Sequence, residues 1–166
     1  MKFVRHGVAL AALACGAVAA PALALEVGER APELTASGPG GPVTLAALKG
    51  KVVYLDFWAS WCGPCRQSFP WMAEMQARYR AKGLHVLAVN LDAKREDADK
   101  FLAQTPAAFA LAFDARGDSA RAYALKGMPS SVLIGADGKV LAIHAGFRED
   151  ERQTLEDSIT AALTRK

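Results

Sequence analysis

Two runs of apolar residues stand out along the chain, and each has the length of a strand. Val52 to Trp58 is apolar except for Asp56, and Leu84 to Leu91 is nearly all apolar. Short continuous apolar runs of this kind are typical of strands that are buried on both faces. The pattern therefore predicts two central strands of a sheet that is covered on both sides.

Helical periodicity begins directly after the first of these strands. From Cys62 to about Lys82 apolar residues recur near helical spacing, and Gly83 stands where such a helix would stop. Pro70 lies inside this segment and predicts a kink. Three further helices are predicted at Lys94 to Gln104, Arg116 to Leu125 and Glu149 to Leu163.

Towards the C-terminus the pattern changes to two short apolar runs, Ser131 to Ile134 and Val140 to His144. Asp137-Gly138 lies between them and is a strong hairpin signal. Near the start, Leu25 to Gly41 has no sustained periodicity, so we expect an extended lead-in and loop there, followed by a short strand at Val43 to Leu45. The element order predicts an α/β domain with a central mixed sheet, helices on both faces and an N-terminal extension.

The first 24 residues have the pattern of a secretory signal peptide. Lys2 and Arg5 precede an apolar, alanine-rich run, and Ala22-Leu23-Ala24 places small residues three and one positions before a cut. We therefore expect residues 1–24 to be a signal peptide and residues 25–166 to form one domain in the periplasm.

Two other interpretations of this leader remain open. Gly7 to Leu25 could serve as a membrane anchor, because its length marginally spans a bilayer. Ala12-Leu13-Ala14-Cys15 loosely resembles a lipobox, which would make the protein a lipoprotein. Both are weaker than the signal peptide, since the run is mostly alanine and the stretch before Cys15 is short.

Charge and cysteine content narrow the range of functions that this chain can have. The formal net charge is +3, with Lys2 and Arg5 in the leader, and nothing in it implies a nucleic-acid partner. Of three cysteines, Cys15 lies in the leader, so Cys62 and Cys65 alone remain in the mature domain. An exported protein meets oxidising conditions, yet a C-x-x-C loop is too short to stabilise a fold as a cross-link. The pair therefore indicates redox chemistry or metal binding.

The cysteine pair stands where the strand Val52 to Trp58 runs into the first helix. Cys62 is expected at the helix N-terminus, where free N–H groups and the helix dipole stabilise a thiolate. Cys65 follows three residues later on the same face and can attack a mixed disulfide formed by Cys62. Pro64 suits a first helical turn, and Gly63 leaves room for a partner. We predict that Cys62 attacks and Cys65 resolves.

The segment from Asp56 to Cys65, with the sequence DFWASWCGPC, resembles the active-site segment of thioredoxins almost letter for letter. Further similarity lies in the exported start, Gln67 to Pro70, Val86 to Asp92, Gly127 to Pro129 and Asp137 to Val140. Over most of residues 30–164 the chain resembles the TlpA/ResA-like branch of membrane-anchored or periplasmic reductases. The resemblance implies a thioredoxin-like fold.

The resemblance also implies roles for residues outside the cysteine pair. Pro129 would be cis beside the cysteines, and the backbone of Met128 would pair with an extended substrate. Asp56 would accept the proton of Cys65, with a pKa raised by burial among apolar neighbours. Independently of the resemblance, the position of Trp61 directly before Cys62 predicts that its side chain is partly exposed as an apolar platform for a partner chain. The alternatives are a simple turn proline at Pro129 and a solvated strand-edge charge at Asp56.

Two positions depart from the family pattern. Ser68 stands where TlpA/ResA-like proteins often have a glutamate, which weakens the case for a role in cytochrome c maturation. Ala88 stands where thioredoxins have a lysine near the buried acid, so we expect Asp56 to lack a cationic neighbour.

These features predict a thiol–disulfide oxidoreductase that reduces protein disulfides without an organic cofactor or metal. A Gly-Pro dipeptide between the cysteines resembles thioredoxin, at about −270 mV, more than the oxidant DsbA, at about −120 mV. We expect cysteine-containing protein substrates, a membrane electron donor of the DsbD type, and a monomer. The alternatives are a thiol peroxidase, although the P-x-x-x-T-x-x-C site is absent around Cys62, and a copper-handling chaperone with His144 as a weak third ligand.

Overall fold

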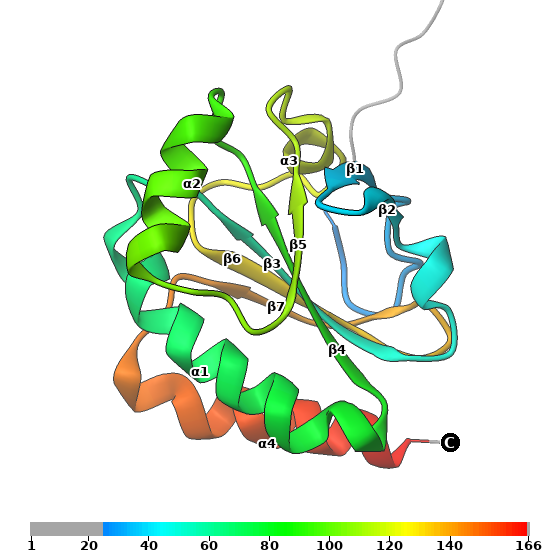
Figure 1. Cartoon of the computed structure of the whole chain (residues 1–166). Helices are drawn as coiled ribbons and strands as arrows, with labels where there is room; N and C mark the ends of the chain where they lie inside the picture. Colours follow the sequence, from blue (N-terminus) through cyan, green and yellow to red (C-terminus); the bar gives the residue numbers. More distant parts are fainter. Residues whose placement is uncertain (1–24, 166) are drawn as a thin grey trace, which may run out of the picture.

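Seven strands form one mixed sheet in the order β2-β1-β5-β4-β3-β6-β7 (Figure 1). The structure is a computed structural model, and it describes residues 25–165. Strand β3 pairs in parallel with β4, and β4 with β5, whereas the other pairs are antiparallel. The strands are β1 (Thr35–Gly38), β2 (Gly41–Thr44), β3 (Val52–Trp58), β4 (Leu84–Asn90), β5 (Ala110–Phe113), β6 (Ser130–Ile134) and β7 (Val140–Ala145).

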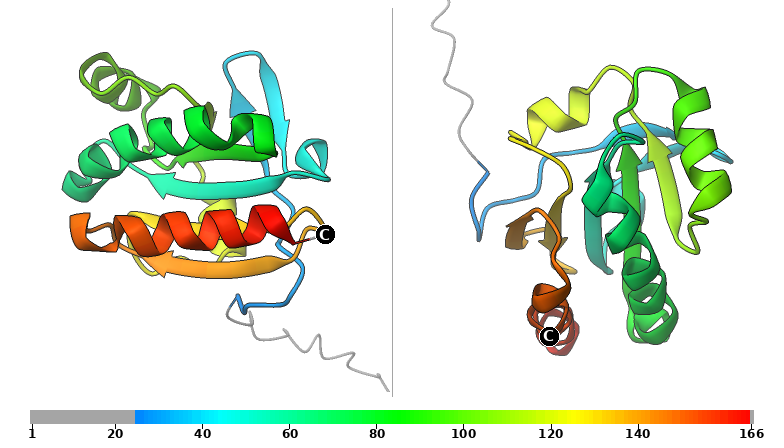
Figure 2. Two further views of the ribbon diagram at one scale, coloured as in Figure 1. Left: turned by 90° about the horizontal axis from the view of Figure 1, so that it is seen from below. Right: turned by 90° about the vertical axis from the view of Figure 1, so that its left-hand side faces the viewer.

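Helices cover both faces of this sheet. The α-helices are α1 (Gly63–Tyr79), α2 (Arg95–Gln104), α3 (Asp118–Ala122) and α4 (Arg152–Thr164), and the 3-10 helices are η1 (Ala46–Leu48), η2 (Arg80–Lys82) and η3 (Glu149–Glu151). Helices α1 and α4 lie side by side over one face (Figure 2), where Arg78 of α1 forms an ion pair with Glu156 of α4.

Side chains along β3 alternate between the two faces of the sheet, so the hydrophobic core consists of two clusters, one on each face. Tyr54 and Trp58 belong to the cluster beneath α1, α2 and α4, and their rings contact Trp71 and Phe69 of α1. Val53, Leu55 and Phe57 point the other way, into a second cluster that includes Tyr123, just after α3, and residues of the N-terminal extension such as Leu34. Because every residue of β3 is buried, the strand is apolar throughout except for Asp56.

The prediction of a mixed α/β sheet of thioredoxin type is confirmed, as are both central strands and the C-terminal hairpin. Helix α1 runs through Pro70 without interruption, and the chain leaves η2 through Gly83, whose φ of 103° suits glycine. That stop was predicted from the sequence.

Two strands were missed. Leu25 to Gly41 was expected to be a lead-in and loop, but β1 lies within it and forms a hairpin with β2. Strand β5 was not predicted either, because its sequence Ala-Leu-Ala-Phe is short and carries no β-branched residue. Strand β1 is held by pairing with β2 and β5, and strand β5 by pairing with β1 and β4, and sequence periodicity does not reveal these pairings.

The expected signal peptide, with the anchor and lipoprotein alternatives, lies outside the described residues. Among residues 25–165, no helix has both the length and the apolar character needed to cross a membrane.

Candidate active site

Cys62 is the N-cap residue of α1. Its backbone is extended, and its Sγ accepts a hydrogen bond from the backbone N–H of Cys65 at 3.3 Å. The two sulfur atoms are joined in a disulfide, with 5.4 Å between the Cα atoms. Cys62 is 3% exposed and Cys65 is fully buried. The helix N-terminus therefore favours negative charge on Cys62, the sulfur nearer to solvent.

The loop before Cys62 is fixed from the end of β4. Asp92 accepts hydrogen bonds from both the backbone N–H and the hydroxyl of Ser60, each at 2.9 Å. Asn90 in turn donates to Asp92 at 2.7 Å. Sequence reasoning missed these two residues as supports of the site, although both lie in the segment 86–92 that carries the family resemblance. Their role depends on strand β4 ending beside β3.

Exposed residues flank Cys62 on both sides in the chain. Trp61 has 69% of its surface exposed, as predicted, although large aromatic side chains are usually buried. A Cβ added to Gly63 would meet no heavy atom within 4 Å, so that position is free on its outer side. Pro64 lies in the first turn of α1, where no intrahelical partner is needed for its missing N–H. A partner chain can therefore approach the cysteine closely.

The segment Met128-Pro129 contains a cis peptide bond, as the family resemblance implied. Met128 packs against the core cluster that contains both cysteines. Within the described part of the chain, its backbone N–H and C=O take part in no hydrogen bond, whereas Pro129 accepts one from Gly146 at 2.8 Å. The backbone of Met128 thus has a free donor and acceptor.

Asp56 lies beneath α1, between Tyr54 and Trp58 on the same face of β3. It is 2% exposed, and its Oδ2 atom has no hydrogen-bond partner among the described residues. Burial raises the pKa of this carboxyl well above its ordinary value. The interpretation of Asp56 as a solvated strand-edge charge is therefore wrong, and the predicted burial is confirmed.

Neutral residues occupy the two positions that depart from the family pattern. Ala88 is the direct partner of Asp56 in the β3–β4 register, so a methyl group stands beside the carboxyl. Ser68 is buried and donates a hydrogen bond to the carbonyl of Cys65 at 3.1 Å. Neither position therefore places a cation beside the buried carboxyl of Asp56.

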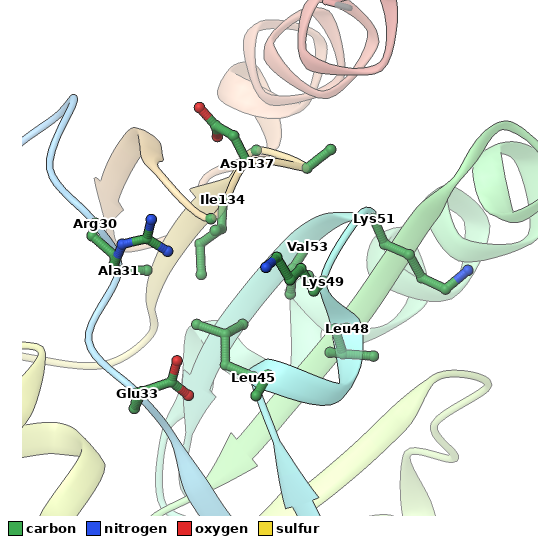
Figure 3. Close-up of a pocket in the computed structure, with 14 residues that line it drawn as sticks. Arg30, Ala31, Glu33, Leu45, Leu48, Lys49, Lys51, Val53, Ile134 and Asp137 are labelled. Atoms are coloured by element: carbon green, nitrogen blue, oxygen red, sulfur yellow. The ribbon is translucent and has the colours of Figure 1, made fainter.

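A pocket of about 210 Å³ lies away from the cysteines, where β3 begins (Figure 3). It is lined by Arg30 and Glu33 of the lead-in, by Lys49 and Lys51, and by Asp137 of the β6–β7 turn. Cys62 follows the opposite end of β3, so the redox pair lies outside this pocket. In the described region, residues 25–165, no three His, Cys, Asp or Glu side chains come together as a metal site.

Comparison with known proteins places the chain in a family. Residues 26–162 match the model of the Redoxin family. The chain is 33% identical over 134 residues to thiol-disulfide oxidoreductase ResA of Bacillus thuringiensis subsp. konkukian, covering 80% of this chain and 76% of that protein. It is 34% identical over 136 residues to ResA of Geobacillus thermodenitrificans, covering 80% and 78%.

Among solved structures, one assigned as thiol:disulfide interchange protein DsbE of Chlorobium tepidum superimposes with a TM-score of 0.83 and 58% identity. The match covers 84% of this chain and 99% of that one. The disulfide at the N-terminus of α1 and the cis proline lie within the region matched by the family model. The chain therefore belongs to the Redoxin family, as a thiol–disulfide oxidoreductase of the TlpA/ResA type.

Proposed function

We propose that this protein reduces disulfides in exported proteins, with Cys62 as the attacking thiolate and Cys65 as the resolving thiol. The observation that carries the proposal is the position of Cys62 at the N-cap of α1, bonded to Cys65 and beside the exposed Trp61. A thiolate at a helix N-terminus is stabilised as an anion and is also a good nucleophile towards sulfur.

The reaction has two exchange steps. The Cys62 thiolate attacks one sulfur of the substrate disulfide, which forms a mixed disulfide and releases the other substrate sulfur as a thiolate. Cys65 then loses its proton and attacks Cys62, which forms the Cys62–Cys65 disulfide and releases the second substrate thiolate. Two electrons pass from the protein dithiol to the substrate.

Asp56 is the proposed proton acceptor for Cys65 in the second step. The carboxyl lies under α1, the helix that carries Cys65, and its raised pKa brings it towards the working pH. Ala88 leaves that pKa raised, because a cation at the same position would lower it.

The proposed substrate site combines apolar contact with backbone pairing. Trp61 supplies exposed apolar surface, Gly63 and Pro64 leave the cysteine accessible, and Met128 offers a free backbone donor and acceptor beside Pro129. An extended peptide can pair with such a backbone as an added strand. This arrangement fits unfolded or flexible protein chains that carry cysteines.

The proposal also includes the direction of electron flow and the partners of the protein in the cell. The Gly-Pro dipeptide between the cysteines favours a reductant, and the signal-peptide pattern of residues 1–24 supports work in the periplasm. We propose that the protein acts there as a monomer. A reductant in an oxidising compartment must be recharged, so we propose a membrane electron donor of the DsbD type. Apocytochrome c is a candidate substrate through the TlpA/ResA relationship, although Ser68 stands where the family often has glutamate.

The direction is tested by equilibrating the protein with mixtures of reduced and oxidised glutathione and quantifying the Cys62–Cys65 disulfide. We expect a potential nearer about −270 mV than about −120 mV. The reduced protein should then reduce insulin and a disulfide-linked Cys-x-x-Cys-His peptide, the haem attachment motif. A potential near that of DsbA, with oxidation of reduced peptides, would contradict a reductase.

A further inference from the structure

The pocket at the start of β3 has an apolar floor and a charged rim. Five of its lining residues are apolar and belong to, or pack against, the second core cluster: Ala31, Leu45, Leu48, Val53 and Ile134. Charged side chains from the lead-in, from the segment after η1 and from the β6–β7 turn surround this floor (Figure 3). A concave site with an apolar base and a few polar groups at its edge is typical of sites for small molecules.

Backbone hydrogen bonds hold the parts of this rim together. The N–H groups of Ala31 and Gly50 donate to carbonyls of the β6–β7 turn, at 2.9 and 3.1 Å. Arg30 directly precedes the first of these donors, and Lys49 directly precedes the second. Both cations are therefore carried by segments that are attached to the same turn, so the rim is formed before a ligand arrives.

Arg30 and Lys49 are the two cations that point into the pocket. In Figure 3 their charged groups are directed inward from opposite sides, with Ile134 between them in this view. A Cβ added to Gly138 would lie 3.5 Å from Arg30 Nη1, which places the guanidinium over the β6–β7 turn. Among residues 25–165, neither cation forms an ion pair. An anionic group between the two would supply the partner that both lack.

Two acidic residues of the rim restrict the kind of anion. Asp137 accepts a hydrogen bond from the N–H of Lys139 at 3.1 Å, and Figure 3 shows its carboxylate directed away from the apolar floor. Glu33 lies in the lead-in, beyond Leu45 in the same view, and its charge would repel a second negative group at that end of the pocket. The pocket therefore suits a ligand with one negative group and not two.

The volume of the pocket sets the size of the ligand. An apolar cavity of about 150 Å³ in another protein binds benzene. At about 210 Å³, this pocket has room for a ring of that size and one carboxylate. The ring would cover the apolar floor, and the carboxylate would reach the two cations. Arginine in particular can bind a carboxylate through two parallel N–H donors.

We propose that this pocket is a binding site for a small aromatic monocarboxylate. The carboxylate lies between Arg30 and Lys49, and the ring lies on Leu45 and Ile134. Binding is non-covalent and does not involve the cysteine pair, because Cys62 follows the other end of β3. The site is therefore independent of the proposed disulfide chemistry, and either can fail without the other.

The test is a benzoate titration of the isotope-labelled, oxidised protein, followed by amide chemical shifts in NMR. We expect shifts at Ala31, Gly50 and Gly138 that saturate in the millimolar range, as befits so small a ligand. The indole N–H of Trp61 should not shift, because this side chain lies at the cysteine end of the sheet. Saturable shifts confined to Trp61 and Cys62, or no saturation at tens of millimolar, would overturn the proposal.

Three further probes separate the parts of the ligand. Benzamide has the ring without the charge, and acetate has the charge without the ring, so each should bind at least about tenfold more weakly than benzoate. Terephthalate carries a second carboxylate and should also bind more weakly, because that group would face Glu33. Equal binding of benzoate and any one of these probes would overturn the proposal, since the pocket would then not select for a ring with a single charge.

Variants of the rim test the two cations. Arg30→Gln and Lys49→Gln should each weaken benzoate binding by about three- to tenfold, since each removes one partly exposed charge-assisted contact. Arg66→Gln is the matched control, because it removes an exposed arginine at the cysteine end, in the first turns of α1, and should leave binding unchanged. Unchanged binding in both rim variants, or equal weakening in the control, would overturn the proposal.

Ala46→Phe blocks the pocket while every charge remains. Ala46 is exposed and lines the pocket, so a ring at this position should occupy the space of the ligand and abolish saturable benzoate binding. The melting temperature of each variant shows whether it is folded. If a rim variant does not fold, Ala46→Phe carries the test, and benzoate binding as tight as in the wild-type protein would overturn the proposal.

Discussion

Asp56 and Ala88 are direct partners in the parallel register of β3 and β4, so a buried carboxyl faces a methyl group. Both side chains are almost fully buried, and Oδ2 of Asp56 has no hydrogen-bond partner in the described region. The carboxyl is thus destabilised as an anion by burial and receives no compensating charge from β4. Its chemistry and its effect on stability both follow from this pairing.

Asp56→Asn should make the protein more stable and a slower catalyst. Asparagine carries no charge whose burial must be offset, so we expect a gain of about 1–3 kcal/mol in the free energy of unfolding at pH 7. Asparagine also cannot take the proton of Cys65, so the resolving step should slow. Denaturant unfolding measures the free energy of unfolding, and the release of the second thiolate measures the rate of the resolving step. If neither differs from wild type, Asp56 is not the proton acceptor for Cys65.

The pH dependence of that stability gain has a defined sign. Because the pKa of Asp56 is raised in the folded state, the folded protein binds the proton more tightly than the unfolded chain. Asp56 should therefore favour the folded state of the wild-type protein most strongly below about pH 3.9, the ordinary pKa of aspartate. This contribution to stability should be lost as pH rises through the folded pKa. The Asp56→Asn gain should accordingly shrink towards acid pH, and a constant gain would contradict burial of an ionisable group.

Asp114 is a buried aspartate that should behave in the opposite way. Burial raises the pKa of Asp114, but hydrogen bonds from the side chain and backbone of Ser119, with those from Asp118 and Gly117, outweigh it and lower the pKa overall. One of these bonds joins Ser119 N to Oδ2 of Asp114 at 2.7 Å.

Asp114→Asn should therefore lower the free energy of unfolding by about 1–3 kcal/mol at neutral pH, since hydrogen bonds to a charged group are lost. The stability that Asp114 contributes is present above the ordinary aspartate pKa and is lost as pH falls through the lower folded pKa. The difference from wild type should vanish in acid, as measured by unfolding across pH. A stabilising effect at neutral pH would show that the hydrogen bonds do not hold Asp114 ionised.

Asp92→Asn should loosen the loop that carries Trp61 and Cys62. An amide NH₂ replaces one of the two oxygens that accept from Ser60, which should cost about 1–3 kcal/mol of stability. Attack by Cys62 should slow by up to about tenfold, since misplacement of a reacting group by an ångström can cost roughly 100-fold. Asp99→Asn, in an exposed ion pair with Arg95 on α2, is the control and should change neither stability nor rate. Equal behaviour of the two variants would show that Asp92 does not position the loop.

Trp61→Ala should impair reduction of protein substrates but not folding. The side chain is largely exposed, so its removal should change the free energy of unfolding by only about 0.5 kcal/mol or less. We expect kcat/KM for insulin to fall while the reaction with a small aromatic disulfide is nearly unchanged. Val27→Ala removes another exposed apolar side chain, far along the sequence from the cysteines, and should affect neither substrate. Equal loss with both substrates would place Trp61 in the chemistry of Cys62 and not in substrate binding.

The site was predictable where its chemistry is local in sequence. The spacing of Cys62 and Cys65 after a buried strand was enough to expect the cysteine at the N-cap of α1, and the single acid in an apolar strand was enough to expect burial of Asp56. Each of these inferences uses only one helix or strand and the residues at its end.

The parts that were missed depend on how distant segments meet. Strands β1 and β5 are short and poor in β-branched residues, and they form because β1 pairs with β2 and β5 pairs with β4, with one further pair between β1 and β5. Register of this kind is set by the packed sheet as a whole. Likewise, Arg30 and Lys49 have no marked pattern in the sequence, and they line one pocket only because their segments are both attached to the β6–β7 turn.

The most direct test of the central claim is capture of mixed disulfides by single cysteine variants. Cys65→Ser leaves Cys62 able to attack but removes the thiol that releases the substrate, so it should accumulate disulfide-linked complexes with cysteine-containing periplasmic proteins. Cys62→Ser should capture almost none, because Cys65 is fully buried. The complexes are counted on non-reducing gels after acid quenching and alkylation, and reduction should dissolve them. Equal capture by the two variants, or capture by neither, would contradict Cys62 as the attacking and Cys65 as the resolving cysteine.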